Sequence, residues 1–557
     1  MRVTKPLLFL LLIILTYPFL IKYVYVAHNQ YEQIPLILRI LDPSYLSNDW
    51  IVNVNSHFSP RYFFTLYIGT ISRFIPLHLT YFIHYILTIG LVTLATYYLA
   101  VKIFRSSLTS ILTTMFILFG QKYTLGGNDL VGRDFDPPRF AFGLASSAIT
   151  LFFYQKYLIS SFLLSLATYI HPLIGFEVAT VYFLTLAVIF LRIKLQGKSI
   201  YFQVKKFISS FLLFSLLSSF SLITYLKSFS SYSQITIDKE TVVTILAKIR
   251  APAHYLPSSW AISDFILFGL ILLAGFICFR LLCRTMNFME KWLLIIPVIF
   301  ILILCLLASN SAEIDLLYPI LFAQFFRLTV IIYWLFAILI YGTCFTHMLV
   351  PRKKIIFLFL PVLPFFISHP EVITASGFTH SLYIFLAVTF PLWIILLRKK
   401  VIGIFVFSIF YVIVALSLLF KNFPFHFEQL YPLPTPETKI ASWARENTVP
   451  NAIFLTPLDF YTFRLTANRA IVVDWLVMPF EQSAMVEWAQ RIADVSSIDS
   501  IFEISEEKAR AGFKTITYER LTSLRRKYPF NYVITESTIN LPLEKIYTTD
   551  QFFIYKF

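Results

Sequence analysis

Residues 41–61, LDPSYLSNDWIVNVNSHFSPR, set the expectations for the rest of the chain. This stretch follows an apolar segment long enough to cross a bilayer, yet it carries charged side chains that include Asp49 and Arg61. A second stretch of the same character, residues 126–139 with the sequence GGNDLVGRDFDPPR, also lies between apolar segments. We interpret the two stretches as loops that meet on one face of a membrane and form a site, which the other spans hold in place.

The composition is that of a membrane protein with many spans. Of the 557 residues, 58% are hydrophobic and 14% are charged, and the mean hydropathy is +0.74, whereas about 25% of the residues of a soluble domain are charged. The formal net charge is +16, but residues 421–557 carry basic and acidic side chains in nearly equal numbers. The basic excess therefore belongs to residues 1–420, where it orients the spans, and no nucleic-acid partner is indicated.

A hydrocarbon core about 30 Å thick needs roughly 20 apolar residues per helix, and on that scale the sequence predicts about thirteen transmembrane helices. We take the first apolar run as an uncleaved span, because it is long and lacks a small-x-small cleavage site. Residues 62–75 are apolar but short and contain Arg73, so we expect a helix in the membrane interface there. The expected spans are residues 6–26, 76–101, 106–120, 140–155, 157–170, 173–191, 207–226, 263–281, 292–308, 321–349, 355–368, 379–397 and 401–420.

Basic clusters decide the expected orientation. Pairs such as Lys102/Arg105 and Lys399/Lys400 fall on one side of the membrane when the spans alternate. The positive-inside rule makes that side cytoplasmic, and an odd number of spans then places the C-terminal segment outside. We therefore expect a multi-pass protein of the inner (plasma) membrane, with a periplasmic or extracellular domain at residues 421–557.

The expected outer domain is a small α/β domain that follows the transmembrane domain of residues 1–420. A proline-rich linker leads into alternating helices and strands, and no phosphate-binding loop, GxSxG or HExxH motif occurs. The expected helices are residues 438–447, 483–494 and 515–527. The expected strands are residues 452–456, 470–474, 532–535, 545–547 and 552–555, of which the last two form a hairpin.

Asp49 is the first candidate for chemistry. A carboxylate beside a membrane can act as a general base that activates a hydroxyl for attack. The structural alternative is a solvated loop acid, or the N-cap of a short helix that starts at Trp50. The residue alone leaves both interpretations open.

The second loop holds an Asp-x-Asp pair, Asp134 and Asp136, with Arg133 and Arg139 on either side. Two carboxylates at this spacing can share a hard divalent cation such as Mg²⁺ or Mn²⁺, or the hydroxyls of a sugar. The arginines suit a phosphate, because the planar guanidinium matches its oxygens. Salt bridges among these four residues are the alternative.

Four further residues are candidates for substrate contact. His171 and Glu177 stand near the outer end of one span, and Arg327 lies inside another. Because ionisable groups within a membrane are costly and usually face an interior cavity, Arg327 is a candidate for binding a lipid-linked phosphate, with a structural ion pair as the alternative. His254 lies in the outer loop of residues 227–260 and is placed to close over a substrate.

The arrangement resembles the GT-C class of membrane glycosyltransferases, which includes oligosaccharyltransferases and protein mannosyltransferases. The likeness rests on NDW and SPRYFF in the first loop, IHPLIGF at residues 170–176, the Asp-x-Asp loop and the outer C-terminal domain. It implies transfer of a sugar from a polyprenyl-phosphate-linked donor. By this likeness Asp49, Asp134 and Asp136 are the catalytic acids and the candidate metal ligands.

Two departures from the class leave the acceptor open. The tail has Val473-Asp474-Trp475 where oligosaccharyltransferases carry Trp-Trp-Asp, and the first loop lacks the adjacent Asp-Glu pair of protein mannosyltransferases. A transporter or flippase for lipid-linked saccharides would use the same acids and arginines for binding alone. A non-catalytic partner that keeps the scaffold is the third possibility.

Overall fold

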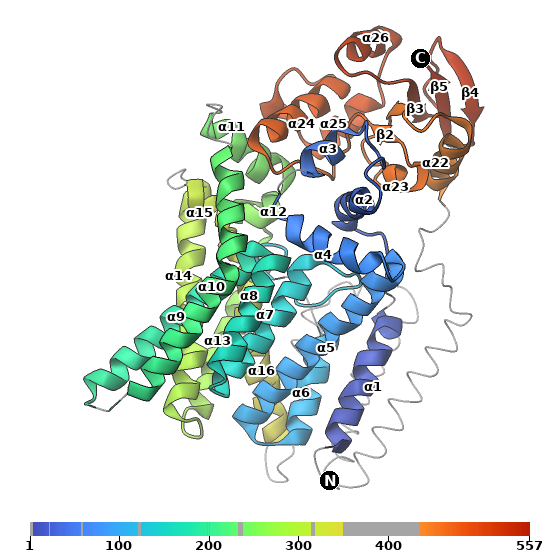
Figure 1. Cartoon of the computed structure of the whole chain (residues 1–557). Coiled ribbons are helices and arrows are strands. Elements are labelled where there is room, and N and C mark those ends of the chain that lie inside the picture. The colour runs from blue at the N-terminus through green and yellow to red at the C-terminus, as the bar shows by residue number, and fades with distance from the viewer. Residues whose placement is uncertain are drawn as a thin grey trace. The chain divides into compact units, whose positions relative to one another are not determined.

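The computed structural model describes residues 4–21, 23–56, 59–120, 124–197, 199, 201–231, 238–313, 318–348 and 435–557. The chain forms two compact units (Figure 1). Unit 1 comprises Met1–Tyr23, His84–Ser219 and Ala253–Phe425, and unit 2 comprises Val24–Ile83, Phe220–Pro252 and His426–Phe557. The expected spans 355–368, 379–397 and 401–420, with the expected domain boundary at residue 421, lie outside the described residues.

Unit 1 is helical, and its long helices are strongly apolar. Within the described ranges, six helical segments are long and apolar enough to cross a membrane, by length and composition: Leu77–Phe104, Pro172–Leu195, Gln203–Leu226, Ile262–Leu282, Phe288–Glu313 and Ile320–His347, the last of which contains a break described below. The protein is therefore a helical membrane protein, while the number of about thirteen spans stays a prediction. The helices that lie wholly or mostly in unit 1 are α1 (Thr4–Ile21), α5 (Leu77–Phe104), α6 (Ser107–Phe119), α7 (Pro137–Phe153), α8 (Tyr157–Ile170), α9 (Pro172–Leu195), α10 (Tyr201–Ser231), α12 (Pro252–Tyr255), α13 (Ile262–Leu282), α14 (Phe288–Glu313), α15 (Tyr318–Ala323) and α16 (Thr329–Met348).

Three consecutive helices are short, as the sequence predicts. α6 has 13 residues, α7 has 17 and α8 has 14. At 1.5 Å per residue, α6 is about 20 Å long, well short of a hydrocarbon core. The loop between α6 and α7, which carries the Asp-x-Asp pair, can therefore lie below the level at which a full-length span would end.

The expected span 321–349 is not one continuous helix, and this corrects the sequence-based prediction. α15 ends at Ala323, a 3₁₀ turn covers Phe325–Leu328, and α16 begins at Thr329. Gln324, between them, has a left-handed backbone with a φ of 54°. A left-handed residue cannot continue a right-handed helix, so the helix breaks there and Arg327 lies in the 3₁₀ turn.

Unit 2 combines parts of the chain that are far apart in sequence. Its first part holds α2 (Gln30–Leu41), α3 (Trp50–Ser56) and α4 (Tyr62–Ser72). The helix expected at residues 62–75 is thus confirmed as α4, and its placement in the membrane interface stays a prediction. The second part holds α11 (Lys239–Val243), followed by a π-helical turn, Thr244–Arg250.

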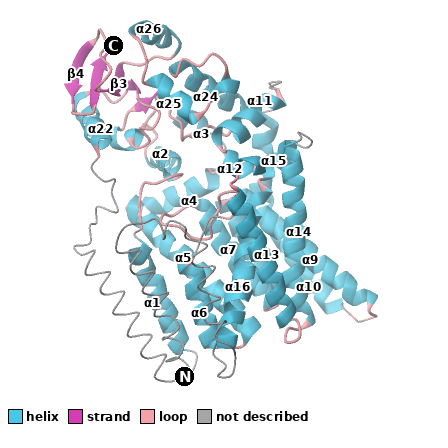
Figure 2. Cartoon of the chain, turned by 180° about the vertical axis from the view of Figure 1, so that it is seen from behind, coloured by secondary structure: helices cyan, strands magenta, loops and turns pink. Residues whose placement is uncertain are grey.

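The third part of unit 2 is the α/β domain that the sequence predicts (Figure 2). Its sheet has the order β2-β1-β3-β5-β4, with β1 parallel to β2 and β3, and with β5 antiparallel to β3 and β4. The helices, strands and terminal hairpin are confirmed, while two short helices, α23 and α25, were not predicted. The elements are α22 (Pro436–Asn447), β1 (Ile453–Leu455), α23 (Phe463–Ala467), β2 (Ala470–Ile471), α24 (Gln482–Val495), α25 (Glu506–Phe513), α26 (Tyr518–Lys527), β3 (Tyr532–Glu536), β4 (Glu544–Thr548) and β5 (Phe552–Lys556).

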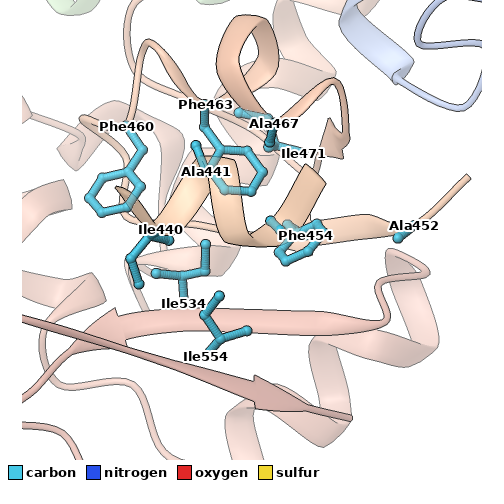
Figure 3. Packing of buried hydrophobic residues seen from close by; sticks show 11 residues of the cluster. Ile440, Ala441, Ala452, Phe454, Phe460, Phe463, Ala467, Ile471, Ile534 and Ile554 are labelled. Atoms are coloured by element: carbon cyan, nitrogen blue, oxygen red, sulfur yellow. The ribbon is translucent and has the colours of Figure 1, made fainter. Parts of the chain in front are cut away.

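The core of this domain lies between α22, α23 and the sheet (Figure 3). Phe454 of β1 packs against Phe463 of α23, with ring centroids 5.0 Å apart, and both side chains are buried. α22 starts at a capping box in which Thr435 and Thr438 bond to each other's backbone N–H. This core fixes α23 and the start of β2, which carry residues of the site below.

Candidate functional site

Asp49 caps a short helix inside unit 2. Its Oδ1 accepts a hydrogen bond from the Val52 backbone N–H at 3.0 Å, which satisfies a free donor at the start of α3. Its Oδ2 accepts from Arg464 Nε at 2.8 Å and from the Ile471 backbone N–H at 3.1 Å. The side chain is fully buried. The N-cap interpretation is confirmed, while the role of general base stays a prediction.

Arg464 joins Asp49 to a second carboxylate. Its Nη1 donates to Asp474, whose other oxygen accepts from the Val477 backbone N–H at 2.7 Å. Burial alone would lower the pKa of Arg464, but the two aspartates outweigh it and raise the pKa above its usual value. We call Asp49, Arg464 and Asp474 the Arg464 cluster; its formal charge is −1, and all three side chains are buried.

A second group of charges in unit 2 retains some contact with solvent. Arg61 Nη1 lies 2.7 Å from Glu32 Oε2, with 22% of the Arg61 side chain and 10% of the Glu32 side chain exposed. Arg250, the last residue of the π-helical turn, donates to the Leu476 carbonyl at 2.6 Å. Burial lowers the pKa of Arg250, and the nearby Glu32 and Asp474 carboxylates oppose that effect. Glu32 thus pairs with Arg61, and its charge also acts on Arg250, so these three side chains form a second charged group in unit 2.

In unit 1, Arg139 gathers the acids of the second loop. Its guanidinium bonds to Asp129 through Nε at 2.8 Å and Nη2 at 3.1 Å, and to Asp134 through Nη1 at 2.7 Å. The salt-bridge alternative is thus confirmed for Asp134 and Arg139, with Asp129 as a partner that the sequence reasoning missed. Gly132 leaves room for this arrangement, since a Cβ there would lie 2.3 Å from Arg139 Cζ. We call Asp129, Asp134 and Arg139 the Arg139 cluster.

Of the two other predicted residues of this loop, Asp136 lies close enough to Arg139 for their charges to interact. Asp136 is half-buried at the start of α7, and Arg133 is exposed. The Asp-x-Asp pair thus has one carboxylate bonded to Arg139 and the other at a helix N-terminus, where a negative charge is favourable. Asp136 and Arg133 stay candidates for substrate contact.

The helix break in unit 1 assembles a polar group around Arg327. Its Nε donates to the Gln324 side chain, and its Nη1 donates to Asn128 Oδ1 at 3.1 Å. Tyr255 bonds to Gln324, and His254 Nδ1 lies 2.5 Å from the Gly126 carbonyl. The break thus meets the glycine-rich start of the second loop, so Arg327 and His254, predicted separately, belong to one neighbourhood.

Glu177 lies on α9 close enough to Arg327 to interact with its charge. The side chain is buried, and neither carboxylate oxygen has a hydrogen-bond partner among the described residues. His171 caps the same helix, since its Nδ1 accepts from the Ile174 backbone N–H at 3.4 Å. Glu177 is therefore placed with the Arg327 group, and His171 has a structural role in starting α9.

The residues predicted to bind a divalent metal do not fit one in this structure. Among the residues that the structure describes, no three His, Cys, Asp or Glu side chains lie close enough together to hold a metal ion. Asp49 and Asp134 each bond to a buried arginine, which competes with a cation for the same oxygens. Asp49 and the Asp134/Asp136 pair also belong to different units, so the convergence of the two loops stays a prediction.

Comparison with known proteins defines the fold. A family model described as "Domain of unknown function (DUF6798)" matches residues 435–495. No curated protein matches the chain. The AglB oligosaccharyltransferase of Archaeoglobus fulgidus, solved with an inhibitory peptide and a dolichol-phosphate, is similar at 12% identity with a TM-score of 0.52, over 96% of this chain and 70% of that one. ArnT of Cupriavidus metallidurans, solved with undecaprenyl phosphate, is similar at 10% identity with a TM-score of 0.53, over 99% and 97%.

The chain has a GT-C-like architecture. This confirms the resemblance inferred from the sequence. This likeness concerns the fold and identifies no functional residue. The candidate site residues are inferred from the contacts described above. Arg464 carried no signal in the sequence, because it lies in a helix that was not predicted and its partner Asp49 is 415 residues away.

Proposed function

We propose that the chain is a membrane glycosyltransferase that moves a sugar from a polyprenyl-phosphate-linked donor to an acceptor on the outer face of the membrane. The observation that supports this most is the likeness over nearly the whole chain to two proteins solved with lipid phosphates bound. Arg327 supports it independently, because it brings a guanidinium into an apolar helix at a break. Such a donor has an apolar tail, which suits the helices, and a phosphate, which suits an arginine.

In this proposal Arg327 binds the donor phosphate. The bonds that Arg327 donates to Asn128 and Gln324 orient the guanidinium, and Glu177 lies close enough to interact with its charge. As the glycosidic C–O bond to phosphate breaks, the phosphate oxygen gains negative charge, which an oriented guanidinium stabilises more strongly than it stabilises the ground state. His254 and Asp136 contact the sugar or the acceptor.

A first-loop carboxylate accepts the proton of the acceptor hydroxyl as that oxygen attacks the anomeric carbon. Asp49 was the carboxylate predicted for this role, but both its oxygens are bonded and its side chain is fully buried. Glu32 keeps some exposure and lies beside Arg61. We therefore place the base at Glu32, and we treat Asp49 as the competing assignment.

Sugar transfer by the purified full chain tests the proposal. A pool of polyprenyl-phosphate-linked sugars should yield a donor-dependent glycosylated product, and its absence from every donor and acceptor pool would contradict the proposal. Glu32→Gln should reduce the single-turnover rate by about 10²–10⁴-fold while donor binding persists. Asp42→Asn is the matched control, because Asp42 is an exposed acid of the same loop whose carboxylate accepts hydrogen bonds from the Ser44 backbone N–H and hydroxyl. A normal rate in Glu32→Gln would contradict Glu32 as the base and favour Asp49, the competing assignment.

Arg327→Lys separates phosphate binding from a structural charge. A lysine keeps the positive charge but cannot reproduce the planar fork, so donor affinity should fall while the protein stays folded. Arg284→Lys, at an exposed position of the same unit to which the proposal gives no role, is the control. Unchanged donor dependence with Lys at residue 327 would show that the charge is structural.

A transporter or flippase for lipid-linked saccharides is the second candidate. The broken helix favours it, because discontinuous helices form the substrate sites of many transporters. Reconstituted vesicles distinguish the two functions: a flippase moves the labelled donor between leaflets without consuming it, whereas the proposed enzyme forms product. If neither occurs, the chain is a non-catalytic scaffold.

The proposal also needs the C-terminal domain outside the cytoplasm. A reporter that is active only in the cytoplasm, fused after Phe557, should remain inactive. A strong signal would overturn the orientation and the outer-face site with it.

A further inference from the structure

Three consecutive residues of the first loop, Asn48, Asp49 and Trp50, each contact the C-terminal domain within unit 2. Asn48 Nδ2 donates to the Asn451 carbonyl at 3.0 Å. Asp49 accepts from Arg464 Nε and from the Ile471 backbone N–H. The tripeptide is therefore bound through an amide and a carboxylate, by residues that lie just before β1, in α23 and in β2.

Trp50 completes the contact with its ring. The Arg491 guanidinium lies 4.0 Å from the centroid of the Trp50 indole and 4.8 Å from the centroid of the Tyr528 ring. Glu487 and the Val472 carbonyl bond to the same guanidinium and fix its orientation. Arginine prefers such faces, and a guanidinium held by three hydrogen bonds is already oriented for the indole.

We propose that the segment of unknown function, residues 435–495, is a receptor for this loop, and that Asn48-Asp49-Trp50 is the docking peptide it binds. Asn451, Arg464, Ile471 and Arg491 all lie within the segment. A backbone carbonyl, a backbone N–H and two guanidinium groups recognise three successive residues, so the surface is selective for an amide, an acid and an aromatic ring in that order.

The docking peptide also positions the charges of the proposed site. Glu32 and Arg61 lie in the same part of the chain as the peptide, on α2 and before α4. Arg61 lies over the ring of Phe480, 5.2 Å from its centroid, and Tyr31 packs against Tyr461 with centroids 5.8 Å apart. Binding of the docking peptide brings α2 and the start of α4 into these contacts. Arg464 and Arg491 therefore act as positioning residues for Glu32 and Arg61.

A peptide-binding experiment on the purified full chain tests the receptor. The triple variant N48G/D49S/W50G removes the native occupant, and a fluorescent peptide with the sequence of residues 44–56, SYLSNDWIVNVNS, then probes the empty surface. The triple variant should bind this peptide at least about tenfold more tightly than the wild type does, because the wild-type loop competes at the high effective concentration of an intramolecular ligand.

Matched variants locate the binding surface. Arg464→Gln or Arg491→Ala, added to the triple variant, should abolish peptide binding, and a peptide with Asn in place of Asp49 should bind at least about tenfold more weakly. Arg525→Ala is the control, because Arg525 also lies over a ring, that of Phe557, but belongs to α26, outside the segment of residues 435–495. Equal binding by wild type and triple variant, or retention of binding with Gln at residue 464, would overturn the proposal.

A second measurement needs no triple variant. Chymotrypsin should cleave after Trp50 and Tyr45 faster when the loop leaves the domain, because Trp50 begins α3 and packs against Arg491 in the docked state. Asp49→Asn should increase the cleavage rate there by about tenfold, and Asp42→Asn should leave it unchanged; equal rates in the two variants would contradict docking. Neither assay contains a sugar donor, so a negative result would contradict the docking proposal without contradicting the proposed glycosyltransferase activity.

Discussion

The Arg139 cluster and the Arg464 cluster have the same chemistry: one buried arginine bonded to two aspartates. They differ in where the partners come from. Asp129 and Asp134 lie 10 and 5 residues before Arg139, whereas Asp49 lies 415 residues before Arg464. The first cluster forms within one loop, whereas the second forms only when distant parts of unit 2 fold together. They also differ in exposure, since 15% of the Asp129 side chain is exposed and neither aspartate of the Arg464 cluster is.

The largest effect is expected from Arg464→Gln. The change leaves two aspartates buried without their cation, and breaking a buried ion pair in this way costs about 3–5 kcal/mol. Thermal unfolding of the full chain, followed by tryptophan fluorescence, should show the loss, because Trp488 bonds to the Asp474 carbonyl. Arg510→Gln removes a partly exposed ion pair of the same domain and should cost less than about 1 kcal/mol.

A smaller effect is expected from Arg139→Gln, about 1–3 kcal/mol, because Asp129 can turn to water once it is released.

Hydrogen exchange would then show the difference between the clusters. Arg139→Gln should raise exchange only around residues 129–140, whereas Arg464→Gln should raise it both at residues 46–56 and at residues 464–475. If Arg464→Gln raised exchange at only one of its two segments, the two segments would not unfold together, and the Arg464 cluster would not couple them.

Gly132→Ala tests the packing of the Arg139 cluster without removing a charge. The added methyl would lie 2.3 Å from Arg139 Cζ and 2.6 Å from its Nη2, so the guanidinium must move and its bonds to Asp129 must lengthen. A moderate loss of stability, of about 1–3 kcal/mol, is typical of such overpacking. Gly269→Ala is the control, because its Cβ would meet nothing within 4 Å. Equal stability of the two variants would show that the loop relaxes freely.

The smallest effect is expected at Asp494, a carboxylate near the surface of the same domain. Burial alone would raise its pKa, but bonds from Lys527, Tyr528 and Gln490 outweigh it and lower the pKa below its usual value. Its contribution to stability is therefore present above the unfolded pKa of about 3.9 and is lost as the pH falls below that value. Unfolding from pH 7 to pH 3 should show a shallower acid-side loss in Asp494→Asn than in the wild type. Parallel curves would show that Asp494 is not linked to folding.

The same contrast explains what could be predicted from the sequence. The apolar helices, the short α6 and α8, the alternating elements of the tail and the terminal hairpin follow from local periodicity and length, and they are confirmed. The bond between Asp134 and Arg139 was foreseen as an alternative, because the partners lie within one loop. Whether an acid such as Asp49 acts as a base or as a cap depends on a partner that folding brings to it.

The helix break at Gln324 shows the same limit in a different way. The residues from 321 onward are apolar enough for one continuous span, and the only anomaly in the sequence was Arg327. The break depends on one left-handed residue and on the bonds of Arg327 to Gln324 and Asn128. The hydrogen bond from Arg327 to Asn128, which is 199 residues away along the chain, thus accompanies a local change of the backbone. Hydrophobic periodicity cannot predict such a change.

The distance of 415 residues between Asp49 and Arg464 has a consequence for biosynthesis. At about 5–20 residues per second, Arg464 is synthesised roughly 20–80 s after Asp49. During that interval the first loop has been made but its receptor has not, and the charge of Asp49 keeps the loop in water beside the growing membrane protein. The last part of the chain to be synthesised therefore completes the first loop, and a chain that ends before residue 464 leaves that loop without its support.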